Sequence, residues 1–143
     1  MFYFAAFLVF AADLLIKLIV SSRLSPAQSI PLIKGILNLT YVRNTGVAFG
    51  LFPGQRAPLI LIGIAVCAIV LYFYAKAGKA DPLLNIFLAV ILGGSLGNLF
   101  DRVAFGYVVD YIDFRVFPVF NFADIAINLG VLFIILHLFL KRE

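Results

Sequence analysis

Charged side chains are scarce in this 143-residue chain, and their scarcity excludes most soluble proteins. Only 13% of the residues are charged and 64% are apolar, with a mean hydropathy of +1.14, whereas a soluble domain is usually about 45–50% apolar and about 25% charged. A fold of this size leaves much of its surface exposed, so it cannot hide this apolar area from water. The composition predicts one domain surrounded mostly by lipid. It excludes a cytosolic enzyme, a disordered chain and a disulfide-stapled secreted module.

Cysteine and histidine occur once each, and this limits the chemistry that the chain can use. Cys67 lies alone in an apolar run, which excludes an intramolecular disulfide and a cysteine-based metal site. With His137 as the single histidine, a conventional zinc site is also disfavoured. We therefore expect no metal and no cofactor.

The net charge of +4 does not indicate a nucleic-acid-binding protein. The eleven Lys and Arg residues are spread along the chain, with no run longer than Lys141-Arg142. A surface that follows phosphates needs clustered cations, so we expect no nucleic-acid partner. Cations lying beside anionic lipid headgroups are the simpler interpretation.

Four apolar stretches are long enough to cross a bilayer, whose core of roughly 30 Å needs about 20 helical residues. The predicted spans are residues 2–20, 57–75, 82–100 and 122–140. Asp81 is expected to cap the third span, with Pro82 at its first helical position. No basic segment precedes the first apolar run, so we expect a retained membrane helix there and not a cleavable signal peptide. We predict an all-α membrane protein with four transmembrane helices in a single polytopic domain, residues 1–143.

Two longer segments, residues 21–56 and 101–118, are expected to lie outside the membrane. In the first, Gly35–Arg43 partly alternates as a strand does, and Asn44-Thr45-Gly46 supplies turn residues before a second short run, Val47–Phe52. We predict a small β-hairpin, or cradle, between the first two helices at the membrane surface.

The distribution of cations predicts the orientation of the chain in the membrane. Four spans place both termini and the short connection 76–81 on one side. The cations on that side are dense and close to span ends, whereas those in the longer segments are dilute and mixed with acids. By the positive-inside rule we predict cytoplasmic termini, with residues 21–56 and 101–118 on the outer side.

Ionisable residues in membrane helices are costly and are candidates for function. Asp13 and Lys17 lie four residues apart on one face of the first span. They form either a self-neutralising pair that reaches toward the interface or part of a functional site.

The end of the third span combines small and polar residues. Gly93 and Gly97 have the spacing that lets another helix approach closely. Asn98 and Arg102 share a face, with Asp101 adjacent. The amide and the guanidinium can bind carbonyls or an anionic headgroup, or they can cap the helix C-terminus; spacing alone does not choose.

Asp110 and Asp124 are the strongest candidates for catalysis. Asp110 lies in an apolar run, and Asp124 opens the fourth span, where Asn121 and Asp124 resemble a capping box. The functional alternative is a pair of carboxylates that share one proton and activate water, as in aspartic proteases. In such a pair we expect Asp124, in the first turn of a helix, to be the more ionised partner. We expect Asp110, in its apolar run, to hold the proton.

Four sequence blocks together resemble the lipoprotein signal peptidases, also called signal peptidase II. The blocks are Asp13…Lys17, Asn44-Thr45-Gly46-Val47-Ala48-Phe49-Gly50, Gly97-Asn98-Leu99-Phe100-Asp101-Arg102 with Val108-Val109-Asp110, and Phe120-Asn121-Phe122-Ala123-Asp124. They occur in order across nearly the whole chain. One departure is in the first block, where Leu14 and Ile16 replace the family's usual Gln and hydroxyl residue. That departure weakens a direct substrate role for this block.

The resemblance implies a bacterial inner-membrane aspartyl endopeptidase with four membrane helices and an active site near the outer face. A β-cradle and a short surface helix would cover this site. Its substrates would be prolipoproteins, cut on the amino side of a cysteine that carries diacylglyceryl. It implies no metal or cofactor, a monomer in contact with membrane lipids, and inhibition by cyclic peptides of the globomycin type. The implied catalytic pair is Asp110 and Asp124, and the implied substrate-binding or supporting residues are Asn44, Asn98, Arg102, Asn121, Asp13 and Asp101.

Two other classes of protein fit parts of the pattern. A small transporter or proton-relay protein would use Asp13, Asp110 and Asp124 as a polar path. A non-catalytic assembly subunit would use Gly93 and Gly97 for packing against a partner helix. A relay needs polar groups at several depths, whereas here they gather toward one side of the membrane.

Overall fold

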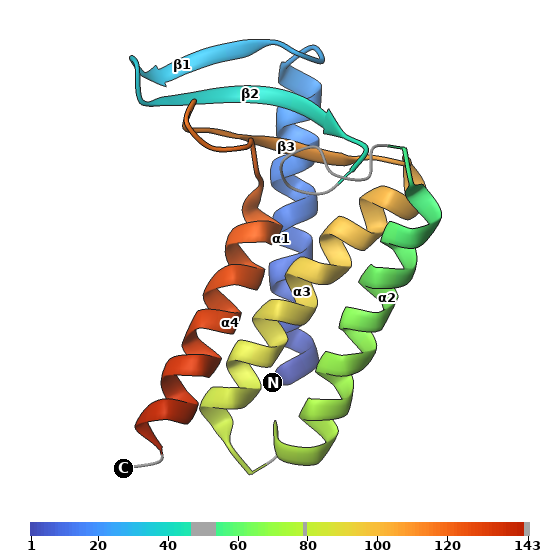
Figure 1. The fold of residues 1–143 in the computed structure, drawn as a ribbon, viewed down its shortest axis with the longest axis vertical. Helices are drawn as coiled ribbons and strands as arrows, with labels where there is room; N and C mark the ends of the chain where they lie inside the picture. The colour runs from blue at the N-terminus through green and yellow to red at the C-terminus, as the bar shows by residue number, and fades with distance from the viewer. Residues whose placement is uncertain (47–53, 79, 142–143) are drawn as a thin grey trace.

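The computed structural model describes residues 1–46, 54–78 and 80–141. Four long helices run alongside one another below a small sheet (Figure 1). They are α1 (Phe2–Arg23), α2 (Arg56–Phe73), α3 (Pro82–Ala104) and α4 (Phe122–Leu140), and α2 continues into a π-helical turn, η2 (Tyr74–Gly78). Each is long and apolar enough to cross a membrane. The predicted four-helix membrane fold is therefore confirmed, although α3 continues to Ala104 and does not end at Phe100.

Helix α3 is the centre of the bundle and packs against the other three helices. More than half of its apolar stretch is buried, compared with about a fifth in each of the others. Glycines allow these close approaches: Gly93 lies against Ala6 and Val9 of α1, and Gly97 lies against Asp13. The close helix packing predicted for Gly93 and Gly97 is present, and the helix that packs against them is α1 of the same chain.

A three-stranded antiparallel sheet lies across one end of the bundle, formed by β1 (Ser29–Ile33), β2 (Leu37–Asn44) and β3 (Val108–Asp113) in the order β1-β2-β3. The predicted hairpin between the first two helices is confirmed, since β1 and β2 pair antiparallel, and the predicted strand Gly35–Arg43 corresponds largely to β2. Strand β2 pairs with β1 and β3. The expected partner, Val47–Phe52, lies outside the described residues.

The position of the turn explains why the sequence pattern favoured a second strand after β2 and not before it. The β1–β2 turn contains Gly35, whose φ of +79° favours glycine, whereas the turn residues recognised in the sequence follow β2. Strand β3 comes from a segment far along the chain, so no local pattern identifies it as the partner of β2. The described residues contain no short surface helix beside the sheet.

The sheet is fixed to the bundle by an apolar cluster at the end of α1. Val20 and Leu24 pack there against Tyr41 of β2 and against Val109 and Tyr111 of β3. Side chains alternate along a strand, so Asp110 lies on the opposite face of β3 from its two neighbours. This alternation turns Asp110 away from the apolar cluster and toward Asn44 and Asn121, which donate to its carboxylate.

Both chain termini lie at the end of the bundle that is opposite the sheet (Figure 1). There Asp81 caps α3 by accepting a hydrogen bond from the Leu84 N–H at 3.1 Å, as the sequence predicted. Its other carboxylate oxygen lies 2.7 Å from His137 Nε2 and 2.8 Å from Lys141 Nζ. Hydrogen bonds from Lys141 and His137 hold the pKa of Asp81 well below its usual value. This contact ties the start of α3 to the end of α4.

Candidate active site

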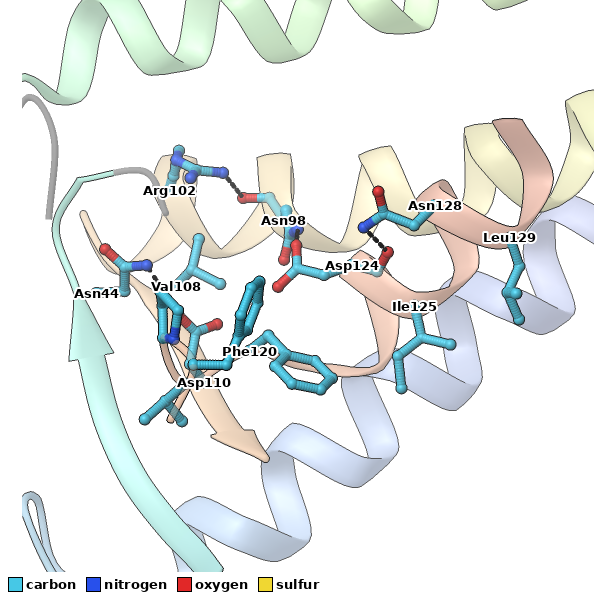
Figure 2. A pocket seen from close by; sticks show the side chains of 13 residues that line it. Asn44, Asn98, Arg102, Val108, Asp110, Phe120, Asp124, Ile125, Asn128 and Leu129 are labelled. Atoms are coloured by element: carbon cyan, nitrogen blue, oxygen red, sulfur yellow. Dashed lines mark hydrogen bonds between the residues drawn. The ribbon is translucent and has the colours of Figure 1, made fainter. Parts of the chain in front are cut away.

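Asp110 and Asp124 line one pocket between the sheet and the helices (Figure 2). Asp110 comes from β3 and Asp124 from the first turn of α4. The pocket has a volume of about 600 Å³, and its polar lining includes Asn44, Asn98 and Arg102. Segments that are distant in the sequence therefore bring five of the predicted site residues to one place.

The Asp110 carboxylate is held by two side-chain amides. Asn121 Nδ2 donates to Oδ1 at 2.6 Å, and Asn44 Nδ2 donates to Oδ2 at 2.8 Å. Asp110 is only 2% exposed. Burial raises its pKa to about 7; the charge of Asp124 also raises it, while the two amide hydrogen bonds oppose the increase. A carboxyl group with this pKa retains a proton at a pH where an ordinary aspartate has lost it.

Asp124 combines a structural and a chemical role in its two oxygens. Its N–H donates to Asn121 Oδ1 at 3.0 Å, and its Oδ2 accepts from the Asn121 N–H at 3.2 Å, which completes the predicted capping box. Its Oδ1 accepts from Asn98 Nδ2 at 2.8 Å. Helical capping and a place in the pocket were alternatives from the sequence, and the structure contains both. The helix N-terminus stabilises a negative charge at this position.

The start of α4 is held by two other segments of the chain, β3 and α1, and by its own N-cap. The first N–H groups of a helix have no partner within it. Here the Phe122 N–H donates to Tyr111 Oη at 3.0 Å and the Ala123 N–H donates to Asp13 Oδ1 at 3.0 Å, while Asp124 is bonded to Asn121. Asp13 therefore supports the helix that carries Asp124, from behind the pocket.

A buried ionic cluster lies behind the pocket. Lys17 Nζ is 2.7 Å from Asp13 Oδ2 and 3.0 Å from Asp101 Oδ2. The three side chains are almost inaccessible, so the alternative in which Asp13 and Lys17 reach toward the interface is wrong. Asp101 also accepts from the Val109 N–H at 3.1 Å, which fixes β3. Asp13 and Asp101 do not line the pocket, because their carboxylates are directed to these buried partners.

Arg102 uses its planar fork to hold the chain beside the pocket. Its Nη1 donates to the Asn98 carbonyl at 3.3 Å, and its Nη2 donates to the Gly46 carbonyl at 3.2 Å. Its Nε is buried and has no acceptor among the described residues. Arg102 thus connects α3 to the segment after β2 and leaves one N–H without a partner at the pocket wall.

Two polar residues at the site were not assigned from the sequence. Tyr111 contacts the start of α4 from the face of β3 opposite Asp110, which only the tertiary structure shows. Asn128 lines the pocket and donates to the Asp124 carbonyl at 2.8 Å (Figure 2). Its spacing of four residues from Asp124 on one helix was a signal available in the sequence.

No group of three His, Cys, Asp or Glu side chains within residues 1–46, 54–78 and 80–141 is arranged to hold a metal ion. The absence of a metal or cofactor requirement stays a prediction. The chemical groups in the pocket are two carboxylates, amides and a guanidinium. They can exchange protons and bind carbonyl oxygens.

The fold and the pocket are those of a multi-pass membrane protein with a candidate active site at one end of the helix bundle. Residues 5–140 match the model of the family described as signal peptidase (SPase) II, and the chain belongs to this family. This confirms the resemblance drawn from the four sequence blocks.

Relatives and solved structures agree with this assignment over almost the full chain. The lipoprotein signal peptidase of Halothermothrix orenii is 42% identical over 143 residues, which are 100% of this chain and 98% of the relative. That of Moorella thermoacetica is 43% identical over 139 residues, 97% of this chain and 93% of the relative. A bacterial membrane enzyme solved by the in meso method at 2.3 Å superposes with a TM-score of 0.90 and 31% identity, covering 98% of this chain and 88% of that one.

Proposed function

We propose that this protein is an aspartic endopeptidase that removes the signal peptide from prolipoproteins on the amino side of the lipid-modified cysteine. Membership of the signal peptidase II family supports the protease activity, and the names of the relatives support the substrate class. One observation carries the catalytic assignment. Asp110 and Asp124 line the same pocket and are bridged by Asn121, which bonds to both of them.

Hydrolysis by this pair needs one ionised and one protonated carboxyl group. Asp124 takes a proton from water, whose oxygen attacks the scissile carbonyl carbon while Asp110 gives its proton to the carbonyl oxygen. When the tetrahedral intermediate collapses, the C–N bond breaks. Asp124 passes its proton to the leaving amine, and Asp110 recovers a proton from the hydroxyl group. Both residues thus return to their starting states.

The remaining lining of the pocket suits a lipidated peptide. Arg102 and Asn44 lie at its polar end and offer N–H donors to substrate carbonyl oxygens. Ile125 and Leu129 of α4 continue the lining with apolar side chains (Figure 2). A substrate would place its scissile bond between the carboxylates and its acyl chains along this apolar wall. Peptides of the globomycin type would compete for the same pocket.

The alternatives are less well supported. Asp13, Asp110 and Asp124 gather around the start of α4, where Asp13 accepts from the Ala123 N–H and Asn121 bonds to both Asp110 and Asp124, whereas a proton relay requires polar groups at several depths of the membrane. Gly93 and Gly97 already pack against α1, so they offer no free surface to an assembly partner. Both features favour a hydrolytic site at one membrane face.

The test is single-turnover cleavage of a diacylglyceryl-modified precursor in detergent with a chelator present. Asp110→Asn and Asp124→Asn each keep the side-chain shape but remove its acid-base chemistry, so each should abolish cleavage without abolishing precursor binding. Asp113→Asn, on the same strand but outside the pocket lining, is the matched control and should cleave normally. Near-normal cleavage by Asp110→Asn or Asp124→Asn would refute the catalytic pair.

A further inference from the structure

The Asn98 carboxamide lies at the junction between the buried ionic cluster and the catalytic pair. Its Oδ1 accepts from Lys17 Nζ at 3.1 Å and from Asn121 Nδ2 at 3.1 Å. Its Nδ2 donates to Asp124 Oδ1 at 2.8 Å. A carboxamide has one end that accepts and one that donates, and a half-turn about its last bond exchanges them. The direction of this amide therefore decides whether Asp124 faces a donor or an acceptor.

Lys17 is one of two donors that fix this direction, together with Asn121 Nδ2, and it is the charged one. An ammonium group has three N–H donors and no acceptor, so Asn98 can meet it only with its oxygen. Lys17 is 3% exposed and is anchored by Asp13 and Asp101. A lysine that served only to neutralise these acids would need no third partner, yet Nζ also contacts Asn98.

We propose that Lys17 is a positioning residue of the hydrolysis: it holds the Asn98 carboxamide so that an N–H donor always faces the Asp124 carboxylate. This inference rests on the proposed roles of Asp110 and Asp124. A donor on Asp124 stabilises its anion, which is the form that takes a proton from water. Without Lys17, Asn121 Nδ2 alone among the described donors holds the Asn98 oxygen, so the amide is less firmly fixed, and an oxygen turned toward Asp124 disfavours the anion and weakens the base.

The charge of Lys17 has a separate effect that the experiment must remove. Its positive charge lowers the pKa of Asp110. Four other charged or titratable groups face Lys17 or the proposed catalytic pair. They are Asp13 from α1, Asp101 and Arg102 from α3, and Tyr111 from β3. Substituting Lys17 alone would therefore change both the donor and the local charge.

A double variant separates the donor from the charge. Lys17→Met with Asp101→Asn removes one cation and one anion, so the formal charge of the cluster is unchanged while the donor to Asn98 is lost. The asparagine introduced on α3 would retain a side-chain oxygen to accept from the Val109 N–H. The reference is Asp101→Asn alone, and Lys34→Met, at an exposed lysine of the β1–β2 turn, is the matched lysine control.

The measurements are the pH dependence of kcat/KM, kcat and KM for the lipidated precursor, and melting temperature in detergent. Relative to Asp101→Asn, the double variant should lose roughly tenfold to a hundredfold in kcat, the effect of one charge-assisted hydrogen bond. KM should change little, and the acidic limb of the profile should move to higher pH. In an Asn98→Leu background, the Lys17→Met step should cost less than about twofold, because Lys17 acts through Asn98.

The outcomes separate this inference from the proposed function. Cleavage by Asp124→Asn would refute the catalytic pair. If Asp124→Asn is inactive but the double variant retains kcat with an unmoved acidic limb, the role of Lys17 alone is refuted. The role of Lys17 would also be refuted if Lys17→Met lowered kcat by the same factor in the Asn98→Leu background as in the protein that retains Asn98. If the double variant does not fold, Lys17→Arg takes its place, because it keeps a donor and the positive charge. The acidic limb of its kcat/KM profile should stay where it is, and a shift of that limb would refute the positioning role of Lys17.

Discussion

Asp110 and Asp124 have the same side chain, but their surroundings differ. Asp110 lies in the interior of a strand, where burial stabilises its neutral form, although two amides donate to it. Asp124 lies in the first turn of a helix, where the positive end of the helix dipole and the Asn98 amide favour a negative charge. This asymmetry supports the proposed division of work, in which Asp110 holds the proton and Asp124 is the base.

The protonation of Asp110 predicts the alkaline limit of the reaction. The pKa of Asp110 is raised from its ordinary value to about 7, so its proton is present below that pH and is lost as the pH rises through it. We expect kcat/KM for the lipidated precursor to fall above about pH 7, with a slope of one proton. Asp110 and Asp124 interact, so the pH at which kcat/KM falls is a property of the pair and not of Asp110 alone. A flat profile up to about pH 9 would contradict Asp110 as the acid.

Arg102 provides a second prediction at the scale of single residues. Its fork binds two backbone carbonyls simultaneously, and lysine cannot reproduce this planar geometry. Arg102→Lys should lose most of the cleavage activity while inserting and purifying normally. The matched control is Arg56→Lys. Arg56 also donates to carbonyls at the end of α3 but does not line the pocket, so its variant should remain active. Equal activity of the two variants would make Arg102 a helix-end charge only.

At the scale of elements, the site depends on how closely α1 and α3 pack. Asp13 and Lys17 of α1 reach the start of α4 and the Asn98 amide only because glycines of α3 let the two helices approach. The interhelical distance therefore sets the geometry of the supporting hydrogen bonds. Helix packing and the proposed catalytic site therefore depend on the same helix face.

This coupling predicts different responses to two Gly→Ala substitutions. A Cβ at Gly93 would lie 2.5 Å from the Ala6 carbonyl oxygen and 2.6 Å from Val9 Cβ, so α1 must move. Gly93→Ala should destabilise the protein by about 1–3 kcal/mol and reduce cleavage. At Gly63, a Cβ would meet Leu99 Cδ1 at 3.1 Å, and this flexible side chain can yield. Gly63→Ala should therefore change stability by less than about 1 kcal/mol. Thermal unfolding of both variants in one detergent is the measurement, and equal melting temperatures would contradict the prediction.

At the scale of the whole molecule, polarity is divided between the two ends of the bundle. The sheet lies at one end and both termini lie at the other (Figure 1). The pocket is lined by residues of β2, β3 and the start of α4, while Asp81, which opens α3, contacts His137 and Lys141 at the end of α4. The side chains that face outward between them are largely apolar, as a lipid environment requires. The pocket therefore lies near one membrane face.

The density of cations predicts which face this is. With cytoplasmic termini, a reporter fused after Glu143 should be active only as a cytoplasmic reporter, and so should one inserted in the 76–81 connection. A reporter inserted in the β1–β2 turn, at Gly35, should be active only outside the inner membrane. Activity of the Glu143 fusion on the outer side would reverse the orientation and place the pocket at the cytoplasmic face.

The sequence by itself determined the membrane class, the four helices and the caps at Asp81 and Asn121, because these depend on local composition and on residues a few positions apart. The four sequence blocks likewise identified the family. Only the tertiary structure decided the partners of β2, the convergence of Asp110 and Asp124 on one pocket, and the turn of Lys17 inward to Asn98. Those features depend on which distant segments meet when helices and strands pack. The sequence supplies the hydrogen-bonding groups, but the packing of α1 against α3 and of β3 against β2 selects their partners.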